Sequence, residues 1–155
     1  MFHEDKAINS ILYLLNINGG KMKINKLFRL LFLGDRYHLS KYGRLITDDT
    51  YQTSNEGPIP INIKALIQTT DNIFLWHLEI LSAEISPNLN YLSQSDINAL
   101  EYATNHMETS DCKIGYSIPL GKVLSIEDIL KDYGETMPYI EYIKEKIKVK
   151  QYFLR

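Results

Sequence analysis

The residues of this chain that are best suited to acid–base chemistry lie between positions 35 and 56. They are one histidine and four carboxylates: Asp35, His38, Asp48, Asp49 and Glu56. Such groups act as general acids and bases when a site brings them together and shifts their pKa values. The sequence shows only that they are neighbours along the chain. We therefore favour a structural network around a turn, and keep a hydrolase using Asp35, His38 and Glu56 as the weaker alternative.

Other patterns associated with catalysis or metal binding do not occur in the sequence. The four histidines have no ligand-like spacing, and neither a His-Glu-x-x-His nor a Gly-x-Ser-x-Gly motif is found. The run Gly19-Gly20-Lys21 lacks the spacing of a phosphate-binding loop. The single cysteine, Cys112, excludes an internal disulfide and a cysteine-based zinc site. We expect no catalytic residue, no metal site and no cofactor.

Two glycines and two prolines shape the backbone around these polar residues. Gly43 and Gly57 can adopt a positive φ at no steric cost. Pro58 and Pro60 fix their own φ and push the preceding residues into extended geometry, so the chain must turn before another helix begins. The polar run at residues 50–54 lies between the two glycines and fits a short edge strand.

Apolar residues at helical spacing predict the helices that would hold this turn in place. A Ser-x-x-Asp pattern at Ser93, repeated at Ser125, is typical of a helix start. Pro138 suits the first position of a last helix. The expected helices span approximately residues 5–16, 24–41, 59–70, 94–107, 126–133 and 138–147.

The second of these helices should lie at the centre of the core, because it is apolar on so many sides. Asn25 is one candidate for its N-cap, and Gly43 is expected to end it. Its apolar stripe continues through Asp35, His38 and Tyr42. Buried polar groups need partners. Asp35 and His38 are therefore expected to pair with each other or to cap neighbouring backbone.

Residues 72–80 alternate with a period of two and predict a half-buried strand. Residues 81–86 either continue this strand or return as its partner, and the pattern favours neither. The fold class expected from all elements is α+β and mostly α, with one compact helical domain over residues 1–155 and a small antiparallel β element. The apolar face of the predicted strand consists of Phe74, Trp76, Leu78 and Ile80.

Composition and charge narrow the class of partner. The chain has 155 residues, of which 45% are hydrophobic, enough to bury a substantial core. A net charge of -2 gives no global field that favours nucleic acid or an acidic membrane. The N-terminus has no secretory pattern, and no apolar run is long enough to span a bilayer. We expect a cytoplasmic protein that does not contact a membrane.

A DNA-binding regulator is the runner-up among binding functions. The first two expected helices, joined at Gly19-Gly20, could form a helix-turn-helix motif with basic residues beside it. However, the second helix is too apolar for a recognition helix that lies in a DNA groove. Nucleic acid is thus an unfavoured partner. The basic residues in question are Lys21, Lys23, Lys26 and Arg29.

Four short motifs occur in order along the chain. The first is the run of residues 26–39, in which Lys-Leu, an apolar stretch and Asp-Arg lead to a His-Leu pair. The second is Tyr42-Gly43-Arg44 with Ile46-Thr47 and Asp49, and the third is Tyr51 with Gly57-Pro58-Ile59-Pro60. The fourth is Leu92-Ser93-Gln94-Ser95-Asp96. This ordered set, covering about residues 5–108, resembles the Panacea antitoxin domain of the SocA-like, phage-associated family.

The chain departs from the family pattern at several positions. Leu45 stands where the family often has proline, Asp48 where it has glycine, and Asn55-Glu56 precede Gly57 in place of more typical residues. Residues 109–155 do not match the usual C-terminal pattern, and we interpret them as a divergent helical extension.

The resemblance implies an antitoxin of a bacterial or prophage toxin–antitoxin system. Such a protein neutralises a cognate toxin, encoded beside it, by direct binding and without catalysis of its own. A proteolytic adaptor that delivers the toxin to a protease is the second possibility that the resemblance offers. The motif residues expected to form a structural network are Asp35, Arg36, His38, Tyr42, Gly43, Asp49, Tyr51, Gly57, Pro58 and Pro60.

Tyrosines and the C-terminal tail are the candidate contacts with such a partner. The chain has 11 tyrosines, and tyrosine combines a large contact area with a polar tip. The C-terminal lysines alternate with apolar residues and precede an apolar tip. This pattern fits either a solvated amphipathic end, which is slightly favoured, or a partner-binding tail whose apolar tip needs something to cover it. The candidate partner-binding residues are Tyr37, Tyr51, Tyr152 and Phe153.

Overall fold

The computed structural model describes residues 1–107 and 119–131, and these are mostly helical with two small antiparallel sheets. The expected fold class, α+β and mostly α, is confirmed. The helices are α1 (Glu4–Ile17), α2 (Ile24–Tyr42), α3 (Ile61–Thr69), a 3-10 turn η1 (Leu89–Tyr91), α4 (Gln94–His106) and α5 (Ile126–Leu130). The strands are β1 (Lys21–Lys23), β2 (Tyr51–Gln52), β3 (Ile59–Pro60), β4 (Leu75–His77) and β5 (Ile80–Ser82).

Helix α2 runs through the core, as its apolar content predicted. Leu27, Leu30 and Phe32 are completely buried, and the helix packs against α4 along much of its length. Strand β1 joins α1 to α2 in place of the open turn of a helix-turn-helix motif. The apolar side chains of α2 are enclosed, which suits a core helix better than a recognition helix lying in a DNA groove.

The two ends of α2 differ in how well the sequence predicted them. Gly43 ends the helix as expected: its φ is 84°, and its N–H donates to the carbonyl oxygen of Leu39 at 3.0 Å. The suggested N-cap at Asn25 is wrong. The helix already begins at Ile24, and Lys23 precedes it without a side-chain cap. The Ile24 N–H is satisfied by the carbonyl oxygen of Glu79 at 2.7 Å, so no capping side chain is needed there.

The single strand predicted at residues 72–80 is also wrong. The chain reverses at Leu78 and Glu79, so that β4 and β5 form an antiparallel hairpin. Leu78 and Ile80 are exposed rather than on the inner face. The alternative in which residues 81–86 return as a partner is confirmed by β5. Strand β5 also pairs with β1, giving a three-stranded sheet in the order β1-β5-β4.

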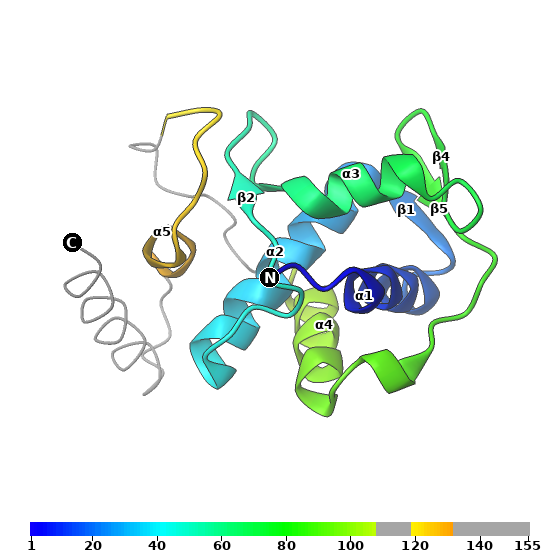
Figure 1. The fold of residues 1–155 in the computed structure, drawn as a ribbon, viewed down its shortest axis with the longest axis horizontal. Coiled ribbons are helices and arrows are strands. Elements are labelled where there is room, and N and C mark those ends of the chain that lie inside the picture. The colour runs from blue at the N-terminus through cyan, green and yellow to red at the C-terminus, as the bar shows by residue number, and fades with distance from the viewer. Residues whose placement is uncertain (108–118, 132–155) are drawn as a thin grey trace.

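Helices α4 and α5 begin as the sequence predicted, each with a capping box. Ser93 and Asp96 form the first, and Ser125 and Asp128 form the second. Helix α5 ends at Leu130, short of the expected residue 133, because Lys131 has an extended backbone. The α5 helix and the β4–β5 hairpin lie at opposite ends of the molecule (Figure 1).

Several sequence predictions fall outside the described residues. They concern the last helix at 138–147, the single cysteine Cys112, and the tail residues Tyr152 and Phe153. Among the residues that the structure describes, no helix is long and apolar enough to span a membrane.

Candidate functional site

Asp35 on α2 is the first centre of a buried polar network. Its side chain accepts a hydrogen bond from the Ile46 N–H at 2.7 Å and another from the Tyr51 hydroxyl at 2.5 Å. Tyr51 is completely buried, and its ring packs edge-to-face against Phe32 with the ring centroids 5.3 Å apart. These contacts hold the loop after α2 and the strand β2 against the core.

The environment of Asp35 favours its protonated form. Burial is the main cause, and it raises the pKa of this carboxyl to about 7. The hydrogen bonds from Tyr51 and Ile46 act in the opposite direction, and the nearby charges of Asp49 and Asp96 add to the effect of burial. Burial likewise raises the pKa of the Tyr51 hydroxyl well above its ordinary value. The Tyr51 hydroxyl therefore stays protonated near neutral pH, whereas the Asp35 carboxyl titrates in that range.

His38, one turn further along α2, is the second centre. Its Nδ1 lies 2.7 Å from the carbonyl oxygen of Arg44, and its Nε2 lies 2.9 Å from Oγ of Ser95 and 3.3 Å from Oδ1 of Asp96. A carbonyl oxygen can only accept, so Nδ1 carries the proton and Nε2 accepts from the Ser95 hydroxyl. Burial is the main cause that lowers the pKa of His38. A neutral imidazole fits this arrangement.

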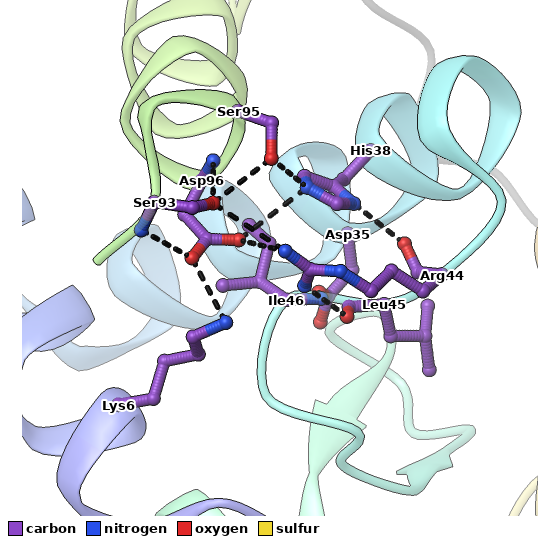
Figure 2. Close-up of polar contacts among 9 residues, drawn as sticks. All are labelled: Lys6, Asp35, His38, Arg44, Leu45, Ile46, Ser93, Ser95 and Asp96. Atoms are coloured by element: carbon purple, nitrogen blue, oxygen red, sulfur yellow. Dashed lines mark hydrogen bonds and ion pairs between the residues drawn. The ribbon is translucent and has the colours of Figure 1, made fainter. Parts of the chain in front are cut away.

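Asp96, at the start of α4, joins the largest number of segments (Figure 2). Its buried carboxylate lies 2.9 Å from Lys6 Nζ on α1 and 3.2 Å from Arg44 Nη2 on the loop. It also accepts the Ser93 N–H at 2.9 Å, which completes the capping box. Burial alone would raise the pKa of Asp96, but the hydrogen bonds from Ser93 and Lys6 hold that pKa below its ordinary value. This carboxylate is an anion that ties α1, the loop and α4 together.

Asp49 has a separate role, which is to cap the start of α3. Its Oδ2 accepts the Ile63 N–H at 2.9 Å, and its Oδ1 accepts the Asn62 N–H and the Asn62 side-chain amide, each at 3.0 Å. A carboxylate at this place satisfies free N–H groups and is favoured by the helix dipole. Asp49 thus provides the cap that Pro60, the residue before α3, lacks.

Asp48 explains one departure from the family pattern. Its φ is 61°, in the left-handed region that glycine adopts most easily and that aspartate tolerates better than most residues. The turn can therefore keep its shape with Asp48 in place of glycine. The Asp48 side chain is exposed and pairs with the N-terminal amine of Met1.

The structure does not assemble the acid–base group suggested by the sequence. Asp35 and His38 do not bond to each other, since each is engaged by separate partners. Asp48 and Glu56 are exposed, whereas Asp35 and His38 are buried. The Ser95–His38 contact is one part of a nucleophile–base pair. Its imidazole and the neighbouring carboxylate are, however, fully engaged in holding segments together, which suits positioning rather than turnover.

The other predicted network residues occupy structural positions. Arg36 is buried, with its guanidinium 5.5 Å from the centre of the Phe32 ring. Gly57 has a φ of 110°, and Pro60 pairs with Tyr51 in the β2–β3 ladder. Pro58 is buried between them, and Tyr42 is 38% exposed with its ring 4.7 Å from that of His38.

The candidate partner-binding tyrosines differ in what they could offer. Tyr37 is half-buried, and its ring stacks on that of Tyr102 at 4.0 Å. Tyr51 is completely buried, so its suggested role in contacting a partner has to be corrected: the ring is needed inside, where it donates to Asp35.

Sequence reasoning missed the central place of Asp96 and its cations. The capping pattern explained Asp96 locally and gave no reason to seek further partners. Lys6 and Arg44 approach it from far along the chain, and no spacing rule connects these positions. Among residues 1–107 and 119–131, no group of three or more histidine, cysteine or carboxylate side chains could hold a metal ion.

Comparison with known families assigns the chain to one of them. The model of the antitoxin SocA-like Panacea domain matches residues 27–139, well over half of the chain, and the protein therefore belongs to this family. The matched region contains every part of the polar network except Lys6 on α1. It also extends beyond position 108, where the ordered motifs ended. No curated protein and no solved structure matches the chain.

Proposed function

We propose that this protein is the antitoxin of a bacterial or prophage toxin–antitoxin system, and that it neutralises a cognate toxin by direct protein–protein binding in the cytoplasm. The observation that carries the proposal is the match to the antitoxin SocA-like Panacea domain over residues 27–139. The protein acts as a binding partner over residues 1–155 and catalyses no reaction of its own.

The buried network supports a binding role because it makes the scaffold rigid. Asp96 fixes α1 and the loop to α4, Asp35 fixes the same loop and β2 to α2, and Asp49 fixes α3. A surface built on such a scaffold loses little conformational entropy when a partner binds, so more of the contact energy becomes affinity. The charges in the network are satisfied within the chain and need no substrate.

Two other functions make different predictions. A DNA-binding regulator would need a helix free to enter a groove, and the burial of α2 argues against its serving as one. A proteolytic adaptor shares the step of binding the toxin but adds a protease. It differs from a simple antitoxin in that rescue would require that protease.

The experiment that tests the proposal is co-expression with the adjacent reading frame. We expect the neighbouring gene alone to arrest growth, and this protein to restore growth and to co-purify with the neighbour's product. A host that lacks its energy-dependent proteases then separates direct neutralisation, which persists, from adaptor function, which is lost. A toxic neighbour that is neither rescued nor bound would contradict the proposal.

A further inference from the structure

The outer face of the three-stranded sheet is formed by two rows of side chains. Directly paired residues of an antiparallel ladder point to the same face, and successive rows alternate between faces. The middle row contains Leu81, which is completely buried, and packs on the core. The two outer rows are Lys21–Ser82–Leu75 and Lys23–Ile80–His77.

This outer face, together with the hairpin tip beside it, exposes several aliphatic side chains. Leu75 is 67% exposed and Ile80 is 39% exposed, and the tip of the hairpin adds Leu78 at 83%. Single exposed aliphatic residues are ordinary, but several adjoining ones on a small sheet mark an interaction site. The hairpin projects from the end of the molecule remote from α5 (Figure 1), so a partner could reach it.

The backbone at the tip strengthens this interpretation. Leu78 has a φ of 56°, in the left-handed region, at the first of the two turn residues. Glycine is the residue that such a position normally requires. A leucine there is strained, and within the described structure its side chain extends into solvent. The turn is nevertheless held in place, because the Trp76 indole N–H donates to the carbonyl oxygen of Leu78 at 2.9 Å. Backbone strain is concentrated at functional sites, so a strained residue that holds an apolar side chain in solvent points to a binding function for that side chain.

The charges on this face indicate the chemistry of the partner. Lys21 and Lys23 line the β1 side of the sheet, both exposed, and His77 lies on the β4 side. Glu79, which is also exposed, lies in the turn beside Leu78 and adds one carboxylate at the tip. The face thus combines a basic β1 edge with an apolar β4 side and hairpin tip, and its complement is an apolar surface with carboxylates along one side.

We propose that the outer face of the β1–β5–β4 sheet, together with Leu78 at the hairpin tip, is where the toxin docks, through an apolar surface of the toxin with acidic residues along one side. This inference rests on the proposed antitoxin function and names the surface that performs it. Leu78 inserts into the partner, while Lys21 and Lys23 pair with the partner's carboxylates and speed the encounter.

Leu78→Gly is the variant that tests the proposal. Glycine suits a φ of 56°, so this substitution removes the contact without harming the turn, and we expect the thermal unfolding temperature to be retained or raised. The probe is the purified product of the adjacent reading frame. We expect Leu78→Gly to bind it roughly 10- to 100-fold more weakly, in the range of hot-spot residues, and to lose growth rescue. Leu120→Gly is the matched control, since Leu120 is 64% exposed in another turn, and it should bind as the wild type does.

A pair of charge-reversal substitutions tests the role of the basic β1 edge. The double change Lys21→Glu with Lys23→Glu should weaken binding and reduce its dependence on salt, whereas Lys122→Glu, at an exposed lysine away from this sheet, should leave both unchanged. If wild type and Leu78→Gly bind the probe equally well, the docking face is refuted and the antitoxin function stands. If the wild type neither binds nor rescues, the antitoxin function itself fails.

Other possible binding partners of this face would give different results. A second copy of this chain on the face would appear as a wild-type dimer in sedimentation that Leu78→Gly converts to a monomer, without any effect on toxin binding. Nucleic acid would appear as binding of duplex DNA that falls steeply with salt and is lost in the double lysine variant. Either result would overturn the assignment of this face to the toxin.

Discussion

Asp35→Asn should change how the stability of this protein depends on pH. The wild-type carboxyl is buried and its pKa is raised to about 7, against an ordinary value of 3.8. The folded state therefore holds the proton more tightly than the unfolded chain does. The stabilising contribution is complete below the unfolded pKa and is lost as pH rises towards the folded pKa. Asparagine has the same shape and keeps an oxygen to accept the Ile46 N–H, but it has no proton to lose.

The size of the effect follows from the two pKa values. Linkage gives the wild type a loss of roughly 2–3 kcal/mol in unfolding free energy between about pH 5 and about pH 8 from this group alone. Asp35→Asn lacks that loss, so its stability relative to wild type should rise by the same amount over the interval. Other titrating groups, His38 among them, contribute to both proteins and cancel in the difference.

Urea unfolding at the two pH values, followed by circular dichroism, measures this difference. Asp48→Asn is the matched control, because Asp48 is an exposed aspartate in the same loop and its left-handed backbone tolerates asparagine equally well. A constant free-energy difference between Asp35→Asn and wild type across the interval would refute the reasoning. It would mean that the donors Ile46 and Tyr51 fully offset the burial of the charge.

Three further changes test the scaffold. Asp96→Ala should lower the free energy of unfolding, measured with urea, by about 3 kcal/mol. This is at the low end for breaking a buried ion pair, because Lys6 and Arg44 can turn towards water. A loss of unfolding free energy below about 1 kcal/mol would be inconsistent with the central position of Asp96 in the network. Gly43→Ala puts a Cβ on a left-handed residue, and we expect roughly 1 kcal/mol less stability by thermal denaturation. Ser125→Ala removes a helix cap, which should speed amide hydrogen exchange in α5 by an amount equivalent to about 1 kcal/mol. An unchanged exchange rate would argue against that cap.

The features that the sequence predicted well are those decided by neighbouring residues. The capping boxes at Ser93 and Ser125 depend on contacts three residues apart, and Gly43 ends α2 through its own backbone freedom. The central position of α2 also follows from its apolar pattern, since no other arrangement would bury so many sides.

Features that depend on distant segments were not predictable in the same way. A period-two alternation fits one straight strand or two short strands of a hairpin, and only a turn residue distinguishes them. Here the turn residue is Leu78, which gives no turn signal. Asp96 shows the same difficulty: its cap was recognisable, whereas Lys6 and Arg44 meet it only after α1 and α4 have packed on α2.

Within residues 1–107 and 119–131, two residues other than glycine have a left-handed backbone, and they show how such an outlier should be interpreted. Asp48 and Leu78 have nearly the same φ, 61° and 56°. Aspartate tolerates this region, so the conformation of Asp48 is explained by the turn alone. Leucine does not tolerate it well, and the described structure offers Leu78 no compensating contact for its side chain, which is 83% exposed. Because the folded chain gives this exposed side chain no role, we infer that its contact is with a partner, and this is why Leu78 rather than the buried Asp35–His38 region marks the proposed docking surface.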